Sequence, residues 1–210
     1  MRRDESSREE IFQDVARCMQ DNDFFRGPST QKLLLDILFI YSKLHPDVGY
    51  RQGMHELLAP ILWVVHCDAL ESNEAREKQE SDLLMAEVLN RDYVEHDTFT
   101  LFCAVMQTAK SFYELGDSNA PIVERTQSIQ DECLGSFDPE LAIHLKVIEI
   151  LPQIYLLRWI RLLFGREFGL KDTLIVWDLL FSENLGASSV DMTCVAMLLR
   201  VRWQRTIFIN

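Results

Sequence analysis

Apolar residues recur at helical spacing along most of the chain. Leu34, Ile37, Leu38 and Tyr41, for example, fall on one face of a helix. The same periodicity predicts helices over residues 7–19, 29–44, 54–67, 83–89, 93–115, 122–134, 139–150, 152–164, 170–181 and 189–203. We find no internal repeat and no segment with a clear strand alternation, so the pattern predicts an all-α fold.

Several predicted helices carry signals at their ends. Ser6 or Ser7 can cap the first helix, and Ser29 can cap the second. Asp138 precedes a proline, which is the typical start of a helix. The helix over residues 54–67 is apolar nearly all round and is therefore expected in the core, with a kink at Pro60.

The composition supports a folded protein that works without nucleic acid. The chain has 210 residues, with 48% hydrophobic and 26% charged residues, and its 8 glycines and 6 prolines are too few for a β-sandwich. A net charge of −12 disfavours nucleic acid and anionic membrane surfaces as partners.

Five scattered cysteines indicate reduced thiols in a cytoplasmic protein. The longest apolar run, Leu57–Val65, is too short to span a membrane, and no secretory leader follows Met1.

Residues 68–92 differ from the rest of the chain in charge. The segment holds eight acidic and three basic residues around a short apolar stretch at 83–89. Such a composition indicates a solvated excursion from the helical body.

Two short motifs carry the chemistry of this sequence. The first is I-x-x-D-x-x-R at Ile11–Arg17. The second is Y-x-Q-G at Tyr50–Gly53, which directly follows Gly49. A surface arginine is usually only solvated, and a turn glutamine is usually only a turn residue. The order and content of the pair are more specific than either residue alone.

Together the motifs resemble the paired signature of TBC domains, which activate GTP hydrolysis by Rab GTPases. Residues 158–168 and 174–181 resemble two further blocks of that family, and the resemblance covers about residues 9–203. It implies a two-subdomain helical fold with a grooved surface. The sequence of Gly53–Pro60 resembles the retromer-associated branch of the family in particular.

The resemblance also implies a role for each motif residue. Arg17 and Gln52 would be the catalytic pair, lent to the GTPase, whereas Asp14, Tyr50 and Gly53 would support them. The protein would then be an activator rather than an enzyme in its own right. GTP and Mg²⁺ would be carried by the partner Rab, and no metal or cofactor would bind this chain. Arg17 and Gln52 must then face a common spot, within ~10 Å of each other.

The resemblance further implies a place and a partner. We expect a cytoplasmic protein peripheral to endosomal membranes, with a late-endosomal Rab and retromer as candidate partners. The alternative is a non-catalytic TBC scaffold that binds Rab or retromer through its acidic excursion. Both residues of the catalytic pair are present, which favours catalysis.

The sequence also departs from the family pattern. Cys18 stands where the family usually has threonine, and His55 stands where many members have asparagine. TBC domains usually carry further helices at both ends, so a domain truncated at both ends is expected, with an atypical tail over residues 204–210.

Two other enzyme classes are disfavoured by missing residues. His55-Glu56 begins H-E-x-x-H, but position 59 is alanine, so a zinc protease motif is incomplete. The chain has neither a P-loop nor a G-x-G-x-x-G motif, so we expect the nucleotide to belong to the partner.

Overall fold

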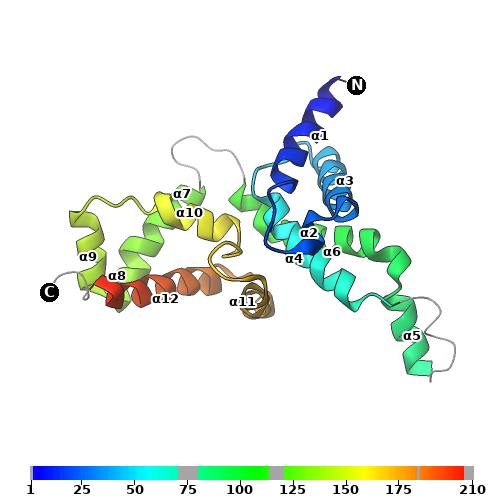
Figure 1. Cartoon of the computed structure of the whole chain (residues 1–210). Helices are drawn as coiled ribbons and strands as arrows, with labels where there is room; N and C mark the ends of the chain where they lie inside the picture. Colours follow the sequence, from blue (N-terminus) through cyan, green and yellow to red (C-terminus); the bar gives the residue numbers. More distant parts are fainter. Residues whose placement is uncertain (1, 71–79, 114–120, 184, 206–210) are drawn as a thin grey trace. The chain divides into compact units, whose positions relative to one another are not determined.

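A computed structural model shows the fold and describes residues 2–70, 80–113, 121–183 and 185–205 (Figure 1). The described residues are predominantly helical, and their one β-bridge pairs Leu70 with Asn90. The prediction of an all-α fold is therefore confirmed. The chain divides into two compact units, residues 1–107 and 108–210, which agrees with the expected pair of helical subdomains.

The first unit contains six α-helices and one 3-10 turn among its described residues. They are α1 (Arg2–Val15), α2 (Asp23–Arg26), α3 (Pro28–Leu44), α4 (Met54–Asp68), α5 (Glu80–Val88), η1 (Arg91–Tyr93) and α6 (Val94–Ala109), which runs just past the boundary.

The core of the first unit forms where α1 packs on α3 and α3 packs on α4 (Figure 1). Ile11 and Val15 of α1 and Leu34 of α3 are fully buried, and the rings of Tyr41 and Phe102 meet edge to face at 5.0 Å. Each such apolar side chain stabilises the fold by about 1.5–3 kcal/mol. This core fixes the end of α1 beside the start of α4.

Helix α4 begins in the core of the first unit. All nine residues from Met54 to Leu62 are buried, which confirms the prediction of a core helix for this half, whereas Val64 and Cys67 in the second half are exposed. Pro60 lies inside α4, and the kink expected there stays a prediction. Because the start of α4 is buried, the loop before it is held firmly against the core.

The second unit contains the remaining described helices. They are η2 (Lys110–Phe112), α7 (Pro121–Ser128), the π-helical turn η3 (Ile129–Cys133), α8 (Leu134–Phe137), α9 (Pro139–Val147), α10 (Gln153–Arg161), α11 (Leu170–Ser182) and α12 (Ala187–Arg205).

Aromatic residues form much of the packing in the second unit. Phe164 and Trp177 are buried, and the Trp177 indole donates to the carbonyl of Leu163 at 2.8 Å. The guanidinium of Arg161 donates to the carbonyl of Phe112 at 3.0 Å. These contacts are structural.

Some predicted helix ends are wrong. Ser6 and Ser7 lie inside α1, which begins at Arg2, so neither caps it. Gly27 rather than Ser29 precedes the helix as its N-cap, because Pro28 can occupy the first helical position without an N–H. Asp138 does cap α9, accepting from the Leu141 amide at 3.0 Å.

Other ends differ because the backbone leaves the α conformation early. The helix predicted to reach residue 164 stops at Arg161, since Leu163 and Phe164 adopt positive φ values of 43° and 64°. The helix predicted over 122–134 contains the π turn η3. Residues 71–79 of the acidic excursion and 206–210 of the predicted atypical tail lie outside the described residues.

Candidate functional site

Arg17 lies beyond the end of α1 rather than on the helix. The helix ends at Val15, and the Arg17 amide donates to the Asp14 carbonyl at 3.1 Å in a tightened turn. The predicted helix over residues 7–19 is therefore too long at its C-terminal end. The Arg17 side chain is 69% exposed, so this turn presents the guanidinium to solvent.

Two hydrogen bonds restrain the Arg17 guanidinium. Its Nε donates to the Gln13 carbonyl at 3.0 Å, and its Nη2 donates to Asp14 Oδ1 at 2.9 Å. The predicted pairing of Asp14 with Arg17 one turn later is present. Charge-assisted bonds of this kind limit the rotamers of a long side chain, so Arg17 is exposed but oriented.

Asp14 also joins the first motif to the second. Its Oδ2 accepts the Tyr50 hydroxyl proton at 2.8 Å, while its Oδ1 holds Arg17. Asp14 is 7% exposed, and a buried carboxylate requires such partners. One carboxylate therefore fastens the Arg17 turn to the loop that carries Gln52.

Gln52 lies in a turn with a glycine on each side. Gly49 has φ 66° and Gly53 has φ 105°, values that side-chain-bearing residues rarely adopt. Gly53 is the N-cap of α4, and the Met54 amide donates to the Arg51 carbonyl at 3.1 Å across the turn. The bend expected at Gly53 is thus present. Gln52 is exposed at the tip of this turn.

The structure therefore brings together the segments that carry the two predicted catalytic residues. Both Arg17 and Gln52 are exposed, and the bond between Asp14 and Tyr50 links their turns. The separation of ~10 Å between the two side chains, derived from side-chain reach, remains a prediction.

A buried polar cluster lies behind this link. His55 Nδ1 lies 3.1 Å from the Tyr50 hydroxyl, and His55 Nε2 lies 3.5 Å from Glu56 Oε1. The Cys18 thiol is 4.0 Å from the His55 carbonyl. His55 is 3% exposed and Glu56 is 4% exposed. Residues that lie one to three positions after each motif thus meet in the buried cluster.

Cys18, His55 and Glu56 are also the candidate metal ligands among the described residues. Their ligand atoms lie within 4.8 Å of one another, and thiolate, imidazole and carboxylate are ligands that Zn²⁺ accepts. The Nδ1 atom of His55 would then bond to Tyr50, as a second-shell partner does. The prediction that the chain binds no metal remains a prediction.

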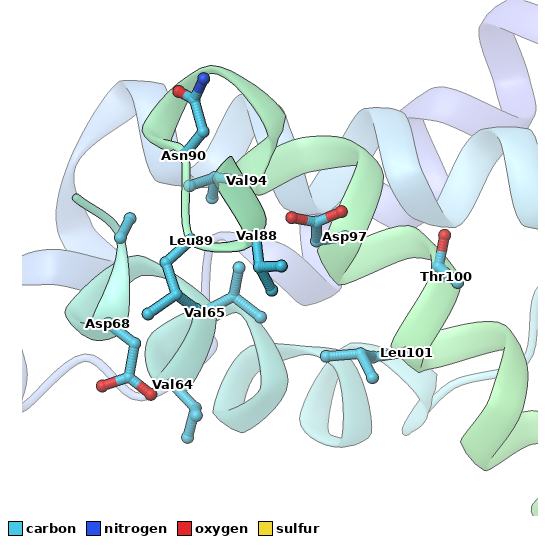
Figure 2. Close-up of a pocket in the computed structure, with 11 residues that line it drawn as sticks. Val64, Val65, Asp68, Val88, Leu89, Asn90, Val94, Asp97, Thr100 and Leu101 are labelled. Atoms are coloured by element: carbon cyan, nitrogen blue, oxygen red, sulfur yellow. The ribbon is translucent and has the colours of Figure 1, made fainter. Parts of the chain in front are cut away.

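The first unit also holds an apolar pocket of about 360 Å³ (Figure 2). It lies where the end of α4, the end of α5 and the start of α6 meet, so it is bordered by both ends of the acidic excursion. The described residues lining it are Val64, Val65, Asp68, Ala69, Val88, Leu89, Asn90, Val94, Asp97, Thr100 and Leu101. The predicted catalytic and supporting residues are not among them.

The base of the excursion is closed by backbone bonds. The Leu70 amide donates to the Leu89 carbonyl at 2.7 Å, and the Arg91 amide donates to the Leu70 carbonyl at 3.1 Å. Between these ends, Leu84, Met85 and Val88 of α5 are exposed. The predicted solvated character is present in the described part of the excursion.

No described helix combines the length and apolarity that crossing a membrane requires.

Comparison of the whole sequence with known proteins identifies the protein family. The family model of the Rab-GTPase-TBC domain matches residues 1–207, and the chain belongs to this family. Human TBC1 domain family member 5 is 41% identical over 95% of this chain and 28% of its own length. The resemblance to this branch is therefore confirmed.

More distant proteins agree with this assignment. Human TBC1 domain family member 13 is 31% identical over 80% of this chain and 38% of its own length. The crystal structure of the Ypt/Rab-GAP domain of Gyp1p shares the fold, with a TM-score of 0.77 and 20% identity over 99% of this chain and 64% of that one. The chain spans about a quarter of the length of human TBC1 domain family member 5.

The sequence motifs do not indicate the contribution of His55. In the sequence His55 is a departure from the family pattern and half of an incomplete zinc motif, whereas in the structure its ring lies against Tyr50. The available signal was position, because His55 follows Gly53 in the first turn of a buried helix. A polar ring there must find a partner in the preceding loop.

Proposed function

We propose that this protein is a GTPase-activating protein for a Rab-family GTPase, with Arg17 and Gln52 supplied in trans. The observation that supports it best is the carboxylate of Asp14, which bonds both Arg17 and Tyr50. In a chain of the Rab-GTPase-TBC family, this link holds an exposed arginine and an exposed glutamine on adjoining turns.

Arg17 would stabilise charge on the transferring phosphoryl group. Negative charge grows between the β- and γ-phosphates as the bond to the leaving oxygen lengthens, and a GTPase alone lacks a close cation there. An arginine supplied in trans is worth about 10³–10⁵ in rate. Its planar fork contacts two oxygens at once, which an ammonium group cannot do.

Gln52 would orient the attacking water. Its carbonyl oxygen can accept a hydrogen bond from the water, while its NH₂ group donates to a neighbouring acceptor. The turn between Gly49 and Gly53 fixes the backbone that carries this amide. Gly53 and Tyr50 would act only through this placement.

GTP and Mg²⁺ would arrive with the Rab, so catalysis needs no cofactor on this chain. A late-endosomal Rab is the partner class that the retromer-associated branch suggests, and the protein would then act at the cytoplasmic face of endosomal membranes. The similarity to TBC1 domain family member 5 supports the assignment to that branch.

Single-turnover GTP hydrolysis by a panel of Rabs, late-endosomal members included, tests the proposal. We expect the protein to stimulate at least one Rab, the stimulation to disappear in Arg17→Ala, and the rate to fall by about 10²–10³-fold in Gln52→Ala. Arg26→Ala is a matched control, because Arg26 is an exposed arginine of the same unit paired with Asp23. Stimulation that survives both substitutions would refute the proposal.

The second candidate function is a non-catalytic scaffold that binds Rab or retromer. The apolar pocket at the ends of the acidic excursion favours it, because Val88 and Leu101 expose apolar surface there (Figure 2). This function predicts binding of a Rab or of purified retromer without stimulation, and loss of binding in Val88→Asp or Leu101→Asp. Stimulation that depends on Arg17 would exclude it as the whole function.

A further inference from the structure

We propose that His55 is a positioning residue for Arg17, acting through Tyr50 and Asp14. His55 Nδ1 lies 3.1 Å from the Tyr50 hydroxyl, which lies 2.8 Å from Asp14 Oδ2. The other oxygen of Asp14 holds Arg17 at 2.9 Å. A continuous chain of hydrogen bonds thus runs from the first turn of α4 to the exposed guanidinium. This inference rests on the proposed function.

The directions of these bonds follow from counting protons. A phenol has one proton, and the Tyr50 hydroxyl gives it to Asp14 Oδ2. Asp14 accepts there and also accepts from the Arg17 guanidinium, as an ionised carboxylate does. The Tyr50 oxygen is then an acceptor toward the imidazole. His55 must therefore carry a proton on Nδ1.

The other ring nitrogen is directed away from Tyr50. His55 Nε2 lies 3.5 Å from Glu56 Oε1. The groups that face the ring are Asp14 from α1, the Cys18 thiol from the turn after it, Tyr50 from the loop, and Glu56 from α4.

Burial makes this arrangement effective. The ring is 3% exposed, so water does not readily replace a lost donor, and hydrogen bonds in such surroundings orient one another. Without the donor at Nδ1, the Tyr50 hydroxyl loses one of its two described partners and can rotate away from Asp14. Arg17, already 69% exposed, would then sample more rotamers. The expected loss is in the rate of hydrolysis rather than in Rab binding.

Substitutions at position 55 separate donation from bulk. Asparagine places an N–H₂ group at the same bonded distance from Cβ as Nδ1, whereas leucine fills the space without a donor. We expect His55→Asn to hydrolyse Rab-bound GTP within threefold of the parent rate. His55→Leu should be about 10–100-fold slower at saturation, the size of loss that misplacement of a catalytic group causes. Rab affinity should change less than threefold in both.

A second measurement uses the unaltered full chain and needs no Rab. The ¹⁵N NMR pattern of the histidine rings at neutral pH shows which nitrogen of His55 is protonated, with His55→Asn assigning the signal. We expect a protonated Nδ1. His96→Leu is the control for histidine replacement, because His96 is exposed in the same unit.

Each outcome decides the inference. A bare Nδ1 would overturn it, as would full activity in His55→Leu or equal loss in folded His55→Asn and His55→Leu. Should His55→Leu fail to fold, the NMR pattern and the rate of His55→Asn decide. If the parent protein stimulates no Rab, the proposed function fails, while the NMR pattern still tests the hydrogen-bond chain by itself.

Discussion

Tyr50 donates its hydroxyl proton to Asp14 at 2.8 Å, across 36 positions of sequence. This bond turns two separate motifs into one site. Arg17 is fixed relative to Asp14, and Gln52 is fixed relative to Tyr50 by a turn with a glycine at each side. The predictions below follow from that arrangement and from the burial around it.

Replacement of Arg17 should abolish stimulation of GTP hydrolysis. Arg17→Ala should lower the single-turnover rate by about 10³-fold or more, the lower bound for a trans arginine. Arg17→Lys should restore little of this, because an ammonium group lacks the planar fork that contacts two oxygens. Full activity in Arg17→Lys would show that only the charge of Arg17 matters.

Replacement of Gln52 should lower the rate without weakening Rab binding. Removal of a single preorganised polar group that acts in the transition state costs about 10²–10³-fold, and we expect Gln52→Ala to fall in this range. Gln13→Ala is the matched control, since Gln13 is exposed and Arg17 uses only its backbone carbonyl. The hydrolysis rate and Rab affinity are measured separately. A pure loss of affinity would contradict this role for Gln52.

Much of the fold could be predicted from the sequence because its helices are strongly periodic. The buried stripe of α3, the core position of α4 and the cap at Asp138 follow from spacing and local chemistry. The end of α1 could not be predicted, since the residues after Val15 remain compatible with a helix. The turn there is stabilised by tertiary packing, with Cys18 fully buried.

The candidate site could be predicted from the sequence only in part. Motif content predicts Arg17 and Gln52 as the catalytic pair, which stays a prediction, and the i, i+3 spacing indicated the bond from Asp14 to Arg17, which is present. The bond from Asp14 to Tyr50 depends on how α1 packs in the first unit, and no local pattern encodes it. The position of the His55 ring depends on the same packing.

Two glycine substitutions should change stability in opposite directions. Gly53→Ala places a side chain at φ 105° and should lower the free energy of unfolding by about 1–3 kcal/mol. Gly135→Ala lies in α8, where an added Cβ meets no atom within 4 Å beyond its chain neighbours and the backbone of its own helix, and should raise that energy by about 0.5–1 kcal/mol. Chemical denaturation measures both. A neutral Gly53→Ala would show that the loop before α4 adapts.

The five thiols should react at different rates in the folded protein. Burial raises the pKa of Cys194 to about 12, so almost no thiolate forms at pH 8, and Cys18 is also fully buried. Cys67 is exposed and should react first with a disulfide reagent. The expected time course is one fast equivalent, lost in Cys67→Ser, with Cys18 and Cys194 reacting only after unfolding. A fast equivalent that persists in Cys67→Ser would contradict this order.

The bond between Asp14 and Tyr50 can be tested by a double-mutant cycle. Tyr50→Phe removes only the hydroxyl, and Asp14→Asn keeps the shape of the side chain while removing its charge. Each should slow Rab-stimulated hydrolysis by about 10–100-fold, because Arg17 loses its orientation. The free energy of unfolding should fall by about 1–3 kcal/mol in each, since a buried partner is left unpaired.

The double variant should cost less than the sum of the two single variants. Residues that bond directly show a coupling energy of about 0.5–3 kcal/mol, so the losses in unfolding free energy and in rate should both fall short of additivity. Tyr93→Phe is the control for the lost hydroxyl, because Tyr93 is exposed in the same unit. Additive losses would mean that the 2.8 Å contact contributes nothing by itself. Coupling in stability but not in rate would separate the fold of the two motifs from their proposed catalytic use.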